Sequence, residues 1–109
     1  AITWLSSHRA PSPDDRIAAS RAADKLLALK GVEAAFALVL SANRTVIISG
    51  RSKGDINVQI ILEKLEGGGH FDMAGAQIRE STLSGACDLL KAAIDNYFEY
   101  DYRKEENQE

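Results

Sequence analysis

Cysteine and histidine are scarce in this chain of 109 residues, and each scarcity excludes a class of site. Cys87 is the only cysteine, so neither an internal disulfide nor a multi-cysteine zinc site can form. His8 and His70 are the only histidines, and no carboxylates stand around them at the spacing of metal ligands. No serine or cysteine nucleophile lies beside a recognisable base. We therefore expect a binding domain that has no catalytic residue and no cofactor of its own.

Long apolar runs and a surplus of basic residues are also missing. No stretch reaches the roughly 20 apolar residues that cross a bilayer, and the first residues lack a secretory signal. The formal net charge of −3 argues against binding to duplex DNA, which requires a basic surface. These features fit a cytoplasmic setting. The chain begins at Ala1 without methionine, so we expect a single domain cut from a longer protein.

What the sequence does contain is the periodicity of an α/β domain. Strands are predicted at 2–5, 32–40, 45–49 and 74–78, and helices at 13–30, 57–66 and 83–97. The second and third strands form a hairpin around residues 41–44. The nearly continuous apolar pattern of the second strand predicts that it is central and covered on both faces. The order β-α-β-β-α-β-α predicts a two-layer sandwich in which helices pack on a mixed sheet.

Start and stop signals support these boundaries. Ser12 followed by Pro13 is typical of a helix start, and Gly31 of a helix end. Asp55 or Asn57 caps the second helix, and Ser81 or Thr82 the third. We expect residues 1–13 to be a strand and linker from a preceding domain. Residues 14–100 are then one folded domain, and residues 101–109 a charged, disordered tail.

The run Gly67-Gly68-Gly69-His70 is the strongest functional signal in the sequence. Three residues without a Cβ let a ligand approach the backbone closely, and a row of N–H donors suits phosphate oxygens. The imidazole adds a donor, an acceptor or a stacking face. A helix C-cap needs only one glycine, so the surplus glycines predict contact with a ligand.

A second cluster of anion-binding groups precedes the second helix. Arg51 and Ser52 place a guanidinium beside a hydroxyl in a predicted loop, 51–54, that leads to a helix start. Asn57 is either the helix cap or a ligand contact. Together with the glycine run, this cluster predicts a phosphate or nucleotide site. A straight helix between the two clusters would be about 15 Å long, so Arg51 and His70 need not contact the same ligand atom.

These segments resemble the DHH-associated domain (the type 1 module) of the DHH phosphoesterase superfamily. The resemblance runs from about Ile17 to Phe98 and is most similar to GdpP-type cyclic-di-AMP phosphodiesterases. It is carried by Ser49-Gly50-Arg51-Ser52, Ile56-Asn57-Val58-Gln59, Glu63-Lys64-Leu65, Gly67-Gly68-Gly69-His70 and Ala74-Gly75-Ala76-Gln77. Two positions depart from the family pattern. Glu66 stands where many relatives carry a fourth glycine, and Asp72 places a carboxylate near the phosphate site, where relatives often have a neutral residue.

The resemblance implies a division of labour between two domains. A preceding DHH domain holds two metal ions, usually manganese, that activate water for attack on a phosphodiester. The associated domain binds phosphate and base through residues that correspond to Arg51, Ser52, Asn57, Gly67, Gly68, Gly69 and His70. The expected ligand is a cyclic dinucleotide or a short oligonucleotide, and the product of cyclic-di-AMP is pApA.

The family pattern also adds membrane-spanning helices, a PAS-like sensor and a degenerate GGDEF domain to the parent protein. It implies a membrane-anchored homodimer that keeps this domain in the cytoplasm. Two alternatives remain open at this stage. The parent is a nanoRNase, pAp phosphatase or single-strand exonuclease of the same superfamily, or the domain is a non-catalytic RNA- or protein-binding module.

Overall fold

The computed structural model describes residues 2–5, 15–41 and 44–101. One mixed sheet has the strand order β1-β2-β3-β5-β4. Its strands are β1 (Ile2–Leu5), β2 (Ala34–Leu40), β3 (Val46–Ser52), β4 (Gly68–His70) and β5 (Met73–Ile78). β1 runs parallel to β2, and the other neighbours are antiparallel. The helices are α1 (Asp15–Leu27), α2 (Val58–Glu63) and α3 (Leu83–Asn96), which continues into the π-helical turn η2 (Tyr97–Asp101).

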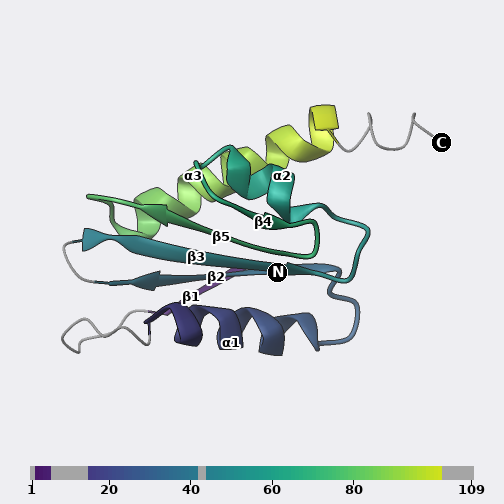
Figure 1. Cartoon of the computed structure of the whole chain (residues 1–109), viewed down its shortest axis with the longest axis horizontal. Helices are drawn as coiled ribbons and strands as arrows, with labels where there is room; N and C mark the ends of the chain where they lie inside the picture. Colours follow the sequence, from purple (N-terminus) through teal and green to yellow (C-terminus); the bar gives the residue numbers. More distant parts are fainter. Residues whose placement is uncertain (1, 6–14, 42–43, 102–109) are drawn as a thin grey trace.

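The predicted α/β class and the mixed sheet packed by helices are confirmed. Figure 1 shows α1 on one face of the sheet and α2 with α3 on the other, so α1 adds a third layer to the predicted two. The predicted order of elements also holds, with β4 as an additional strand before β5. The expected linker, the Ser12 helix start and residues 102–109 of the expected tail lie outside the described residues, whereas Asp101 is the last residue of η2.

The two faces of the sheet are packed with side chains of different size. Towards α2 and α3 the core is built from large residues, with Leu38, Ile48 and Leu62 fully buried. Towards α1 the packed side chains are small. They include Ala19 and Ala23 of α1, which have no exposed surface. Small residues let a helix approach a sheet closely, so α1 lies directly on β2 and β3. As predicted, β2 is central, and six of its seven residues are buried.

Strand β3 is longer than the sequence predicted. The predicted loop 51–54 is wrong for Arg51 and Ser52, which are the last two residues of β3. Both still have sheet partners, because Arg51 lies opposite Ala35 and Met73, and Ser52 lies opposite Ala34. Pairing on both sides extends the strand beyond the point where its apolar pattern ends. Arg51 is therefore held on a rigid strand.

Helix α2 is fixed at its start by two hydrogen bonds. The Asn57 side chain accepts a hydrogen bond from the Ile60 N–H at 3.1 Å, which confirms Asn57 as the N-cap. The Asn57 N–H donates to the hydroxyl of Tyr97 at 3.0 Å. Tyr97 is fully buried. The end of α3 is therefore tied to the segment that carries the candidate site.

The backbone at the end of α2 explains why position 66, where Glu66 departs from the family pattern, favours a glycine. Gly67 N–H donates to Leu62 C=O at 2.8 Å, and Glu66 N–H donates to Glu63 C=O at 3.1 Å. This pair of bonds is a Schellman motif, which places one residue in the left-handed region. That residue is Glu66, with φ of 62°, and not the predicted Gly67. A non-glycine residue is uncommon in this conformation.

We expect Glu66→Gly to stabilise the domain. Glycine adopts positive φ without the Cβ clash that costs other residues about 1 kcal/mol, so the free energy of unfolding should rise by up to about 1 kcal/mol. Urea denaturation measures this change. Glu63→Gly is the matched control, since Glu63 is the exposed last residue of α2, where glycine should destabilise by up to about 1 kcal/mol. Equal losses of unfolding free energy in Glu66→Gly and Glu63→Gly would contradict the assignment of backbone strain to Glu66.

Candidate functional site

The glycine run, which lies between the predicted second helix and the predicted last strand, itself forms an edge strand. Gly68–His70 is β4, which pairs antiparallel with β5. The connecting turn is held by two backbone bonds, in which Ser52 N–H donates to Asp72 C=O at 3.0 Å and Val58 N–H donates to Phe71 C=O at 2.9 Å. Glycines rarely predict a strand. Here β5 and this anchored turn force the extended conformation.

Successive residues of the glycine run point to opposite sides of the strand, so the three glycines differ in whether a Cβ would fit. A Cβ on Gly67 would lie 2.3 Å from the Gly75 carbonyl oxygen, and a Cβ on Gly69 would lie 2.5 Å from that of Met73. Both glycines are therefore required by close packing against β5. A Cβ on Gly68 would meet no atom within 4 Å. Gly68 is the glycine of the run that packing does not explain, and it faces open space.

The sheet register brings the two predicted clusters together. His70 lies opposite Met73, and Met73 lies opposite Arg51, so the three residues form one row across β4, β5 and β3. Directly paired residues share a face of a sheet. The row spans two strand spacings, so the backbones of Arg51 and His70 are about 10 Å apart. In the next row on the same face, two residues along each strand, Gly68, Gly75 and Ser49 leave a strip almost free of side chains.

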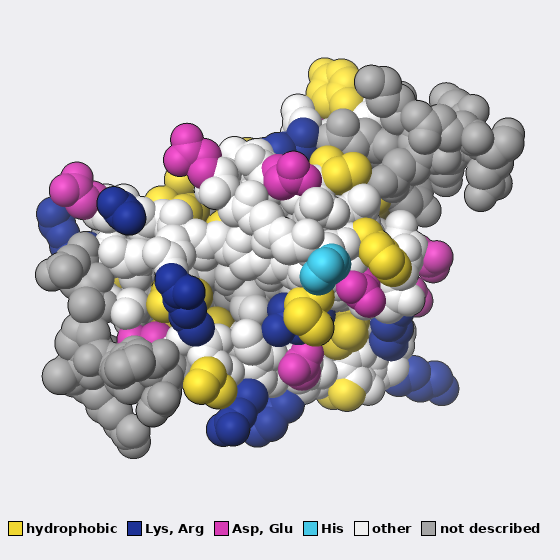
Figure 2. Space-filling model, viewed as in Figure 1, with side chains coloured by type: hydrophobic (Ala, Val, Ile, Leu, Met, Phe, Trp, Pro, Cys, Tyr) yellow, Lys and Arg dark blue, Asp and Glu magenta, His cyan; other side chains and the backbone are white. Residues whose placement is uncertain are grey.

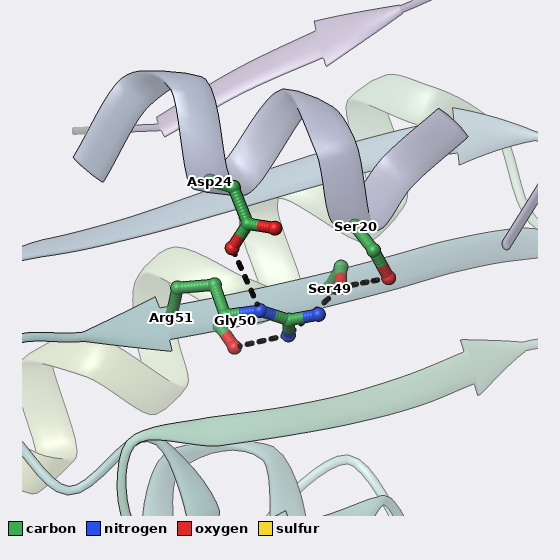
Figure 3. Close-up of polar contacts among 5 residues, drawn as sticks. All are labelled: Ser20, Asp24, Ser49, Gly50 and Arg51. Carbon is green, nitrogen blue, oxygen red and sulfur yellow. Dashed lines mark hydrogen bonds and ion pairs between the residues drawn. The ribbon is translucent and has the colours of Figure 1, made fainter. Parts of the chain in front are cut away.

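Arg51 is held in place by neighbours on the same face (Figure 3). Its Nε donates to a carboxylate oxygen of Asp24 at 3.1 Å, and its Nη1 donates to Gly50 C=O at 2.9 Å. Nη1 also lies 3.3 Å from the Ser49 hydroxyl, which is 3.2 Å from the hydroxyl of Ser20. The Arg51 side chain is 11% exposed, whereas that of Asp24 is 62% exposed. The guanidinium is thus fixed in orientation while one side stays accessible.

A groove runs from α1 across the β4–β5 hairpin to the residues that follow α2 and to Leu89 of α3, and we call it the α1 groove. Its volume is about 1240 Å³, which exceeds the roughly 300–1,000 Å³ of a typical small-ligand pocket. Figure 2 shows an exposed imidazole with apolar side chains beside it on the visible face; among the described residues this histidine is His70. The residues that line the groove include Arg16, Ser20, Arg51, Gly68, His70 and Met73.

The structure brings together most, but not all, of the predicted site residues. Arg51, Gly67, Gly68, Gly69 and His70 all line the α1 groove. Ser52 is buried and accepts a hydrogen bond from Gly54 N–H at 2.9 Å. Ser52 and Asn57 lie outside the lining. Ligand contact by any of the seven predicted residues stays a prediction. Asp72 is also outside the lining.

Sequence reasoning missed the residues on the other side of the groove. Arg16 and Ser20 come from α1, and Gln77 comes from β5. The available signal was spacing, because Arg16, Ser20 and Asp24 recur every four residues and therefore share one helix face. This polar face lies beside the buried Ala19 and Ala23. The sequence did not show which part of the sheet this helix face would meet.

Two features are absent from the described residues. In residues 2–5, 15–41 and 44–101, no three His, Cys, Asp or Glu side chains gather as a group that could hold a metal ion. Within the same ranges, no helix has the length and apolar character of a membrane span.

Comparison with solved structures supports the architecture. An exopolyphosphatase-related protein from Bacteroides fragilis superposes with a TM-score of 0.69 over 88% of this chain and 28% of that chain, at 20% sequence identity. At this identity the likeness shows the fold alone.

Sequence comparisons give the family. Cyclic-di-AMP phosphodiesterase GdpP of Bacillus subtilis (strain 168) is 49% identical over 85 residues, which are 78% of this chain. Cyclic-di-AMP phosphodiesterase PdeA of Listeria monocytogenes serotype 1/2a (strain 10403S) is 44% identical over 82 residues, or 75% of this chain. The chain spans only 13% and 12% of these two relatives. The DHHA1 domain family matches residues 13–99, and the chain therefore belongs to this family.

Proposed function

We propose that this chain is the substrate-binding domain of a DHH-type phosphodiesterase that opens cyclic-di-AMP to linear pApA. The observation that carries the proposal is the placement of Gly68, the glycine without a packing role, in one groove with Arg51 and His70. The names of the two relatives, cyclic-di-AMP phosphodiesterases GdpP and PdeA, favour the cyclic dinucleotide as ligand.

Each groove residue has a part in this proposal that its chemistry supports. The Arg51 guanidinium binds a phosphate oxygen, because it is oriented by Gly50 and Ser49 before the ligand arrives. Gly68 lets the ligand approach the backbone of β4. His70 and the half-exposed Met73 provide an imidazole and an apolar surface against which a nucleobase packs.

The chain itself is assigned no hydrolytic step. Its described residues do not offer a metal-ligand cluster, so the residues present do not fit the two manganese ions that DHH chemistry implies. We propose that a preceding DHH domain of the parent protein holds these ions. We also propose that the parent is a membrane-anchored homodimer with this domain in the cytoplasm.

Gly68→Ala is expected to weaken cyclic-di-AMP binding at least about tenfold, because a methyl group then occupies the ligand's approach to β4. Isothermal titration with the purified chain measures the dissociation constant. The melting temperature should stay the same or rise slightly, because the added Cβ meets no protein atom. Unchanged affinity in a folded variant would mean that the ligand does not lie over Gly68.

Assays of the full-length parent distinguish the two substrate classes. With manganese present, cyclic-di-AMP should be hydrolysed much faster than pAp or short RNA. The reverse order would assign the protein to the nanoRNase and pAp phosphatase group. Hydrolysis of cyclic-di-AMP by the 109-residue chain alone would contradict the proposed division between domains.

A further inference from the structure

One face of α1 contacts the sheet at three polar points. Arg16, Ser20 and Asp24 follow one another at four-residue intervals and therefore lie in line along the helix. Ser20 and Asp24 point down onto β3, where they meet Ser49 and Arg51 (Figure 3). Arg16 meets Gln77 of β5. Arg16 and Ser20 of this polar line form part of one wall of the α1 groove, and Arg51 of β3 also lines the groove.

The two arginines differ in how their charge is balanced. Arg51 forms an ion pair with Asp24, so much of its charge is offset before any ligand binds. Arg16 donates from Nε, at 3.0 Å, and from Nη2 to the side-chain oxygen of Gln77. An amide oxygen carries no formal charge, and within the described ranges Arg51–Asp24 is the one ion pair found. Arg16 therefore brings an uncompensated cation to the groove.

The side-chain groups that the Arg16–Gln77 contact leaves unused are both hydrogen-bond donors. The Gln77 amide is oriented with its oxygen toward the guanidinium, because its NH₂ group would otherwise face other donors. This orientation leaves the Gln77 NH₂ and the Arg16 Nη1 for a ligand. Neither group can accept a hydrogen bond. A phosphate, which offers only acceptor oxygens at neutral pH, satisfies such a pair.

The Arg16 end lies far enough from His70 to be a separate position. Met73, in the row of His70 and Arg51, precedes Gln77 by four strand residues, or about 14 Å. We propose that Arg16 and Gln77 form a second phosphate subsite, so that the groove recognises a nucleotide with two phosphate groups. This inference rests on the proposed function, since the first phosphate is the one bound by Arg51.

Binding of AMP and pApA, measured by chemical-shift titration of the ¹⁵N-labelled chain, tests the subsite. AMP carries one phosphate and pApA carries two. Arg16→Ala should weaken pApA binding about tenfold, the usual scale for one charge-assisted contact, and leave AMP binding unchanged. Gln77→Glu should have a similar effect with Arg16 still present, because a carboxylate would neutralise the guanidinium and repel the phosphate.

Arg21→Ala is the matched control. Arg21 is an exposed cation on α1 that does not line the groove, so its loss changes the net charge equally and should alter either affinity less than about twofold. Unchanged pApA binding by Arg16→Ala would overturn the second subsite and leave the proposed function standing. Equal weakening of AMP and pApA would place Arg16 at the first phosphate and also overturn it. Failure of the wild-type chain to bind either nucleotide would contradict the proposed function itself.

Discussion

Gly67→Ala is expected to destabilise the domain by about 3 kcal/mol, at the upper end of the range for overpacked sites. The new Cβ would lie 2.3 Å from the Gly75 carbonyl oxygen and 2.7 Å from the Ala76 Cβ. Both obstacles belong to β5 and cannot rotate away as the end of a long side chain can. Either β4 must separate from β5, or the end of α2 must move. Thermal unfolding should show a fall in melting temperature of roughly 10–20 °C.

Gly68→Ala is the control one residue further along the chain. It adds the same methyl group to the same kind of residue, but into open space, so the melting temperature should not fall. The two variants separate the packing role of the glycine run from its proposed role in binding. Similar losses of stability in both would mean that β4 is not held against β5 in this register.

Arg51→Ala is expected to weaken binding of cyclic-di-AMP by about tenfold to a hundredfold, because a hydrogen bond to a charged partner contributes about 1.5–3 kcal/mol. Stability should fall by about 1 kcal/mol, since the carboxylate of the ion pair is mostly exposed and contributes little, although the Arg51 side chain itself is only 11% exposed. Isothermal titration and urea denaturation of the same variant measure the two effects.

Arg51→Lys tests whether the shape of the guanidinium matters in addition to its charge. Arg51 contacts Asp24 and Gly50 from different nitrogens of one planar group. A lysine ammonium has no such fork, so it should recover only part of the lost affinity. Full recovery would mean that charge alone suffices. If Arg51→Ala unfolds the domain without ligand, Arg51 is a structural residue and not a binding one.

Much of the fold follows from local signals in the sequence. Asn57 and Thr82 were each one of two predicted caps, and their short polar side chains accept hydrogen bonds from the first turns of α2 and α3. The apolar run of β2 predicted a strand buried on both faces, as found. The sequence also predicted that the glycine run does more than end a helix, because a C-cap needs only one glycine. Local signals, however, did not reveal that Gly67 and Gly69 serve packing.

The features missed from the sequence all depend on contacts between distant segments. β4 exists because β5 pairs with it, and three glycines have no intrinsic preference for a strand. The third layer arises because α1 lies on the face opposite α2 and α3, and helical periodicity does not identify a face. Arg16 meets Gln77 across 60 residues of sequence, so this pair emerges only once the sheet order is known.

The pairing of Arg51 with Asp24 has a consequence for how a ligand enters. A phosphate that binds Arg51 must either displace the Asp24 carboxylate or share the guanidinium with it. Binding therefore resembles ion exchange more than the simple attraction of opposite charges. Because salt screens the Arg51–Asp24 pair and an Arg51–phosphate contact alike, a rise in salt concentration should change the contribution of Arg51 to affinity less than it would for an arginine without a carboxylate partner.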